Sequence, residues 1–222
     1  MLKTSCTLIL LLFLCSASIA QQSQNQDYLS WTSRQAFNIG TKWRVAGRVG
    51  WGSRSNPFSS ENCFYDVRAT LMTAEAIRAA ARLEQLRRHF TDAETQELVM
   101  EAEKIDGLVA IIEINPREGS GIIPLTWNAL LQPKGAKEGS PLSILGINRP
   151  DLRQFRALTT VAPRNYDYDV FWLVFPMKDR EGKGIWDTPP DTIEIVINIG
   201  EKHGRMCWRV NDSLRQRLIS SN

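Results

Sequence analysis

The chain has 222 residues, of which 43% are hydrophobic and seven are tryptophan. Its 27 basic and 24 acidic side chains give a formal net charge of +3 at pH 7. This composition excludes an intrinsically disordered chain, and the near balance of charge indicates no particular class of charged partner.

Residues 1–20 have the pattern of a secretory signal peptide. Lys3 precedes an apolar run over residues 8–14, and small residues lead to Ala20. The run is shorter than the ~20 residues that span a bilayer, and a polar leader over residues 21–27 follows it. We therefore expect cleavage after Ala20, a secreted or periplasmic mature protein and no transmembrane segment after signal removal. A retained membrane anchor is the alternative.

The next part of the chain predicts two strands and a helical hairpin. Alternating apolar residues indicate strands over residues 43–51 and 65–71. The apolar residues that follow recur at intervals of three and four, as on one face of a helix. Thr91 and Glu94 then have the spacing of a capping box, which begins a second helix. A helical hairpin is therefore expected at about residues 73–106.

The second half of the chain predicts mainly strands. They are expected over residues 108–115, 123–131, 155–161, 168–177, 193–199 and 205–210. Exposed loops are expected at 133–141 and 178–191, and a short helix at 214–219. We predict a single α+β domain over residues 28–222, with a mainly antiparallel β-sheet or sandwich of about eight strands and the helical hairpin inserted after the second strand.

Two cysteines remain after removal of the signal, because Cys6 and Cys15 belong to it. A cysteine pair in an oxidising compartment is commonly bridged. We therefore predict a disulfide between Cys63 and Cys207, with two unbridged buried thiols as the alternative.

Motifs for metals, nucleotides and reactive nucleophiles are absent from the sequence. The two histidines, His89 and His203, fall at a predicted helix end and in a predicted turn, and no Cys-x-x-Cys or His-Glu-x-x-His spacing accompanies them. Neither a Gly-x-Ser-x-Gly elbow nor a phosphate-binding glycine loop occurs. The sequence predicts no metal and no cofactor, and its motifs indicate no known family.

Three carboxylates are the best candidates for catalysis, if the protein is an enzyme. Glu113 interrupts an apolar strand, whereas Asp167 and Asp169 stand at the start of another. Two acids roughly 5 to 10 Å apart can act as general acid and base in a glycosidase. Acids at strand ends are also common without any catalytic role.

Ion pairing is the expected role of the arginines on the first predicted helix. Four arginines lie on the first predicted helix: Arg78, Arg82, Arg87 and Arg88. The next predicted helix is acidic, so its carboxylates are expected to pair with these arginines and to repel a polyanion. Asp66 is likewise expected to pair with Arg44 or Arg48 on the neighbouring strand. We expect no nucleic acid among the partners.

Trp186 is the tryptophan most suited to ligand contact. It lies in the Gly-rich loop 178–191, whereas most other tryptophans alternate with apolar residues of predicted strands. The alternative is that its ring folds back onto the domain.

Three functional hypotheses remain from the sequence. The first is a secreted or periplasmic non-enzymatic module that binds a protein or envelope partner or has a structural role. The alternative is a carboxylate-dependent, glycosidase-like hydrolase that uses Glu113, Asp167 and Asp169. The third is a dedicated subunit or inhibitor whose loops 52–62 and 178–191 contact its target.

Overall fold

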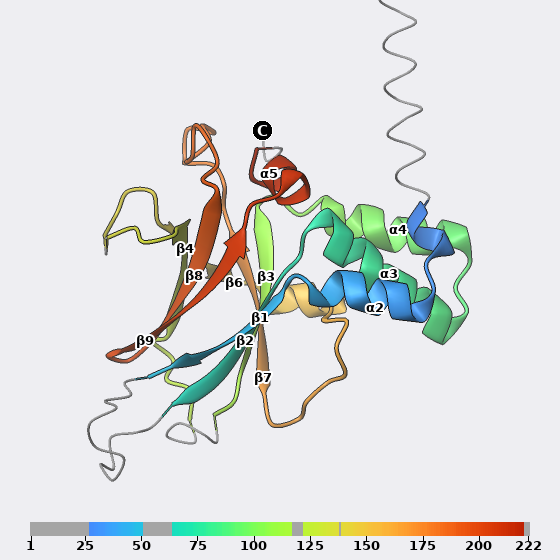
Figure 1. The fold of residues 1–222 in the computed structure, drawn as a ribbon, viewed down its shortest axis with the longest axis horizontal. Coiled ribbons are helices and arrows are strands. Elements are labelled where there is room, and N and C mark those ends of the chain that lie inside the picture. Colours follow the sequence, from blue (N-terminus) through green and yellow to red (C-terminus); the bar gives the residue numbers. More distant parts are fainter. Residues whose placement is uncertain (1–26, 51–63, 117–121, 138, 220–222) are drawn as a thin grey trace, which may run out of the picture.

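The computed structural model describes residues 27–50, 64–116, 122–137 and 139–219 (Figure 1). The predicted signal peptide, most of the predicted leader, the loop 52–62 and Cys63 lie outside these residues. No helix within the described ranges combines the length and the hydropathy needed to cross a bilayer.

The elements follow in chain order. The 3₁₀ helix η1 (Asp27–Ser30) and helix α2 (Ser33–Thr41) precede strands β1 (Arg44–Val49) and β2 (Tyr65–Leu71). Next come helices α3 (Ala74–Arg88) and α4 (Asp92–Glu103), then strands β3 (Leu108–Ile114), β4 (Asn128–Pro133), β5 (Ile144–Leu145) and β6 (Ile147–Asn148). The 3₁₀ helix η2 (Pro150–Gln154), strands β7 (Asp169–Phe175), β8 (Thr192–Ile199) and β9 (Lys202–Arg209) and helix α5 (Asp212–Ile219) follow.

The strands form two antiparallel sheets. Sheet A has the order β1-β2-β3-β7-β6, and sheet B has the order β5-β4-β8-β9. The α+β class, the mainly antiparallel pairing and the inserted helical hairpin are therefore confirmed, with nine strands in the described residues instead of about eight.

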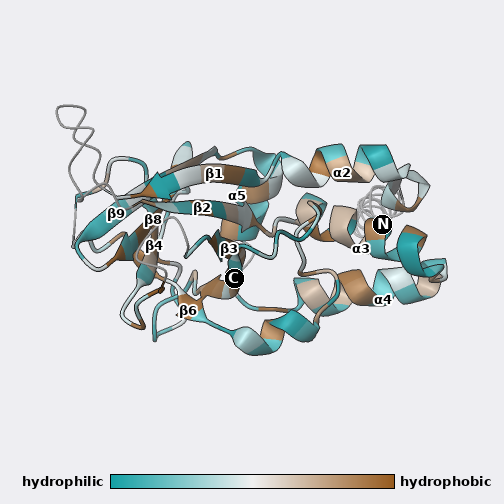
Figure 2. Ribbon diagram, turned by 90° about the horizontal axis from the view of Figure 1, so that it is seen from below, coloured by the Kyte–Doolittle hydropathy of each residue, from teal (hydrophilic) through white to brown (hydrophobic). Residues whose placement is uncertain are grey.

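The sheets and helices pack as layers around two hydrophobic clusters. One face of sheet A packs against sheet B, with Leu71 and Ile112 in the same cluster as Ile195 and Trp208. The opposite face, represented by Val109 of β3, packs instead on the helices. Figure 2 shows the helices α2, α3 and α4 together at one side of the molecule and the strands at the other. This alternation of faces follows from the period of two along each strand.

The helical hairpin begins and ends as its sequence predicts. At the start of α4, the Thr91 hydroxyl accepts a hydrogen bond from the Glu94 N–H, and the Thr91 N–H donates to the Glu94 carboxylate. The Thr91 N–H and hydroxyl hold the pKa of Glu94 below its usual value. His89 ends α3 in the left-handed conformation, with φ of 58°, so the chain reverses within a few residues.

Two short strands join the sheets. β5 pairs with β4 in sheet B, and β6 pairs with β7 in sheet A, with Gly146 as the residue between them. A Cβ atom at Gly146 would lie 2.9 Å from the ring of Phe175. The absence of a side chain therefore lets the chain cross between the sheets beside this buried ring.

The prediction of a strand at residues 155–161 is wrong. The backbone turns there, and the Leu158 N–H donates to the Phe155 carbonyl at 2.9 Å. Ala157 and Leu158 are buried in the cluster between sheet A and the helices. Their apolar character reflects tertiary burial of a loop, which the sequence pattern alone does not distinguish from a strand.

The predicted strand at 123–131 begins later than expected. The Trp127 N–H donates to the Pro124 carbonyl at 3.2 Å, so this part forms a turn, and β4 runs from Asn128 to Pro133. Pro124 has no N–H to donate to a strand ladder, which accounts for the later start.

Candidate binding groove

A groove of about 1420 Å³ lies between helices α2 and α3 and the segment 153–172. We call it the α2–α3 groove. Several of its lining residues are apolar: Phe37, Leu83, Leu86, Phe155 and Trp172. Phe37 and Leu86 are 39% and 38% exposed, respectively. Helices α2 and α3 thus leave apolar side chains accessible in the groove.

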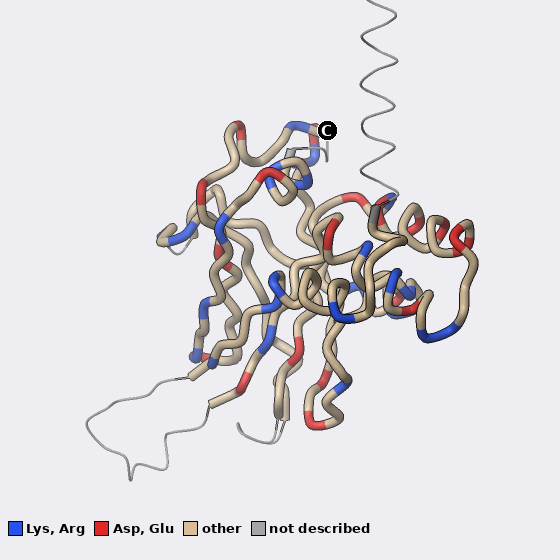
Figure 3. Tube along the Cα trace, turned by 45° about the vertical axis from the view of Figure 1, so that its right-hand side comes forward, with Lys and Arg blue, Asp and Glu red and all other residues tan. Residues whose placement is uncertain are grey.

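Six arginines also line the groove: Arg34, Arg87, Arg88, Arg153, Arg156 and Arg164. Arg87 and Arg88 both form ion pairs with Glu84 on their own helix. The other four have no acidic partner among the residues that the structure describes. Acidic residues instead gather on α4, next to the arginine-rich α3 (Figure 3).

Two of these four arginines stack on aromatic rings. The Arg156 guanidinium lies 5.3 Å from the Phe90 ring centroid, and the Arg164 guanidinium lies 4.8 Å from the Tyr166 ring centroid. A cation–π contact with one ring does not occupy all five N–H donors of a guanidinium. These arginines can therefore be oriented by the protein and still donate to an anion.

Glu113 borders the groove but is engaged by Arg44. The Glu113 side chain is 3% exposed, and its two oxygens accept hydrogen bonds from Arg44 at 2.7 to 3.0 Å. Arg44 lies on β1 and Glu113 on β3, with β2 between them. This pair crosses three strands and fixes the orientation of both side chains.

The three predicted catalytic acids differ in their surroundings. In the strand register Glu113 of β3 is opposite Val170 of β7, and Asp169 is the residue before Val170. Because neighbouring residues of a strand point to opposite faces, the Glu113 and Asp169 side chains start from opposite faces of sheet A. Both residues nevertheless border the groove. Asp167 precedes β7 and is exposed, as is Asp169. Glu113 is thus held in an ion pair, and its side chain starts from the opposite face of sheet A to that of Asp169.

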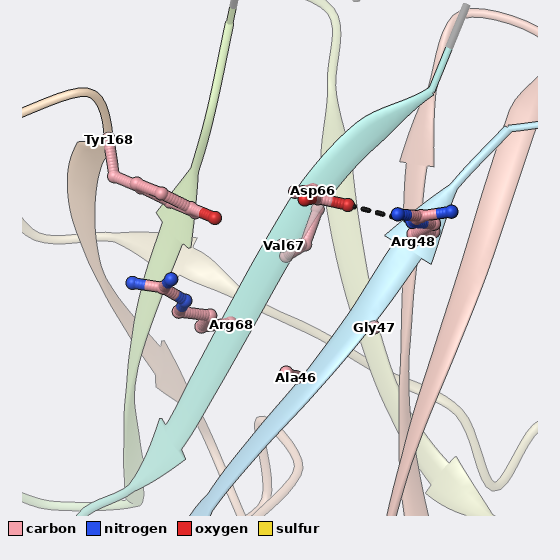
Figure 4. A pocket seen from close by; sticks show the side chains of 7 residues that line it. All are labelled: Ala46, Gly47, Arg48, Asp66, Val67, Arg68 and Tyr168. Carbon is pink, nitrogen blue, oxygen red and sulfur yellow. Dashed lines mark hydrogen bonds and ion pairs between the residues drawn. The ribbon is translucent and has the colours of Figure 1, made fainter. Parts of the chain in front are cut away.

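A smaller hollow of about 300 Å³ lies on the same sheet, over strands β1 and β2 (Figure 4). Arg48 of β1 pairs with Asp66 of β2 at 2.9 Å, which confirms the expected cross-strand ion pair. Arg68 stacks on Tyr168 at 4.1 Å from the ring centroid. Tyr168 lines both the hollow and the α2–α3 groove.

The structure places Trp186 in the core. Its side chain is 8% exposed, and its indole N–H donates to the Leu142 carbonyl at 2.8 Å. The Ile185 N–H donates to the Met177 carbonyl, so the loop folds back onto the sheets. Ligand contact by Trp186 stays a prediction, but the ring's donor is already occupied.

Cys207 is a free thiol in the described part of the chain. Desolvation of its sulfur and then the neighbouring Glu194 carboxylate raise the pKa of this thiol. Glu194 itself is buried and accepts hydrogen bonds from Gln132 and Arg205, both at 2.9 Å. Since Cys63 lies outside the described residues, the Cys63–Cys207 disulfide stays a prediction.

Comparisons with known proteins give no functional relative. No family model and no curated protein matches the chain. A crystal structure of a protein of unknown function from Burkholderia pseudomallei is similar at 13% identity, with a TM-score of 0.42 and coverage of 93% of both chains. Among the described residues, no group of three or more His, Cys, Asp or Glu side chains is arranged to hold a metal ion.

Proposed function

We propose that this protein is a secreted or periplasmic, non-enzymatic module that holds a protein partner in the α2–α3 groove. One observation carries the proposal: the same groove is lined by accessible apolar side chains and by arginines that have no acidic partner among the described residues. Pockets for small molecules commonly measure about 300 to 1,000 Å³. A groove of about 1420 Å³ is better matched to a polypeptide segment.

The hydrolase alternative draws no support from the positions of its acids. A general acid or base must reach the substrate's proton. Both oxygens of Glu113 instead accept hydrogen bonds from Arg44. We therefore keep the binding module as the proposed function, together with export of the mature chain and its Cys63–Cys207 bridge.

Site-specific photocrosslinking in the native compartment tests the proposal. A photoreactive amino acid replaces Phe37 or Leu86 in the groove, or Met100, which is 54% exposed on α4, as the control position. We expect one protein to crosslink reproducibly from both groove positions and not from Met100.

Two outcomes would count against this function. The first is the absence of any groove-specific crosslink in a chain that is folded and exported. The second is a partner that crosslinks equally from all three positions, because such a contact would not depend on the groove. Turnover of a glycoside that is lost in a Glu113→Gln variant that is still folded would favour the hydrolase.

A further inference from the structure

We infer that the segment bound in the α2–α3 groove is an extended acidic peptide in which carboxylate side chains alternate with apolar ones. This inference rests on the proposed function and names the chemistry of the partner. Charge complementarity and the apolar lining of the groove carry it.

The charge argument comes from four arginines contributed by separate segments. Arg34 belongs to α2 and Arg153 to η2, while Arg156 and Arg164 follow η2. They line one groove, and none has an acidic partner in the described ranges. Carboxylates of a bound peptide would supply these partners through charge-assisted, often bidentate hydrogen bonds.

The apolar residues that line the groove are the reason to expect apolar side chains in the bound peptide. Phe37 and Leu86 are more than one third exposed, and Phe155 is partly buried beside them in the groove. Successive side chains of an extended peptide point in opposite directions. One row of apolar side chains can therefore pack on these residues while the intervening carboxylates face the arginines.

An acidic peptide fits the groove better than nucleic acid or a lipid surface. Asp169 also borders the groove, and its exposed carboxylate would repel a continuous row of phosphates. A flat bilayer cannot enter a groove bounded by helices on one side and a loop on the other. A peptide can place its few carboxylates at the arginines and its apolar side chains elsewhere.

Fluorescence anisotropy with labelled ten-residue peptides tests the inference on the mature chain. The probe alternates Glu with Leu; one control replaces every Glu by Gln, and a second replaces every Leu by Ser. We expect the Glu-Leu peptide to bind at least about tenfold more tightly than either control, and its binding to weaken as salt is added.

Variants locate the binding in the groove. The double variant Arg153→Gln/Arg156→Gln should weaken binding of the Glu-Leu peptide about tenfold or more, and Arg34→Gln should weaken it less. Arg180→Gln, an exposed arginine in the 178–191 loop, is the matched control and should leave binding unchanged. Urea unfolding of each variant checks that it is folded. If the double variant does not fold, Arg34→Gln tests the same groove with a single substitution.

Equal binding of the Gln-Leu peptide would overturn the inference, as would loss of affinity in Arg180→Gln as large as in the groove variants. Tighter, groove-dependent binding of single-stranded RNA or of anionic phospholipid vesicles would overturn it as well. If Phe37 and Leu86 still crosslink a partner in these cases, the proposed function stands and only the acidic chemistry fails.

Discussion

Two arginine–carboxylate pairs on sheet A differ in burial and in hydrogen bonding, with three bonds between Arg44 and Glu113 and one between Arg48 and Asp66. The side chains of Arg44 and Glu113 are 18% and 3% exposed, whereas those of Arg48 and Asp66 are 66% and 27% exposed. Water weakens the attraction in an exposed pair, while a buried pair depends on both partners because each would otherwise be a desolvated charge. The same chemistry therefore has different consequences at the two places.

Substitution of Glu113 by Gln should lower the free energy of unfolding by about 1 to 3 kcal/mol, because the partly buried Arg44 guanidinium loses its counter-charge. Arg48→Gln is the matched control and should cost less than about 1 kcal/mol. Urea unfolding of both variants at pH 7 measures the difference. An equal loss in both variants would show that burial does not distinguish the pairs.

At the scale of single elements, the sequence pattern predicts those helices and strands that are determined by interactions between residues close in the chain. The capping box at Thr91 and the alternation over residues 65–71 specify a helix start and a strand, and both elements are present. Helix α2 was not predicted, although Thr32 and Gln35 form the same capping box and offered a readable signal.

Elements and sites that depend on distant segments could not be predicted in this way. Ala157 and Leu158 are buried because they pack between sheet A and the helices, and the indole N–H of Trp186 is bonded to Leu142, 44 positions away. The groove arginines have no common spacing in the sequence, since α2, η2 and the following loop converge only in the fold.

The contact between β1 and β9, the edge strands of the two sheets, makes a prediction about glycine. A Cβ atom at Gly204 would lie 2.3 Å from the Arg48 carbonyl oxygen, whereas one at Gly47 would lie 3.2 Å from the flexible Met206 side chain. Gly204→Ala should therefore lower the free energy of unfolding by about 1 to 3 kcal/mol, because backbone atoms must move.

Gly47→Ala is the control at the same contact, and it should have a smaller effect because Met206 can change its rotamer. Thermal or urea unfolding compares the two variants. If Gly47→Ala were the more destabilising variant, the close approach of β9 to the β1 backbone would not be what restricts position 204 to glycine.

For the whole molecule, sheet A is the middle layer between sheet B and the helices. The helices leave part of its face open, and the groove and the smaller hollow lie there. Composition and charge gave no sign of this surface, because the net charge of +3 averages an acidic α4 with an arginine-lined groove.

The whole-molecule prediction concerns export. Intact-mass spectrometry of the native protein should give a chain that begins at Gln21 and is two hydrogen atoms lighter than the fully reduced form, as a Cys63–Cys207 bridge requires. Reduction by a dithiol reagent, which supplies two electrons and two protons, should restore the mass of the two hydrogen atoms. Retention of residues 1–20 would refute the cleavage, and an unchanged mass on reduction would refute the bridge.

The crossing at Gly146 has a mechanical consequence. Because β5 and β6 are joined by a single residue, separating the sheets would strip one of these short strands from its neighbour. Force applied to one sheet is passed directly through a covalent link beside Phe175 to the other. A displacement of either sheet would therefore be transmitted to the other through this one-residue connection.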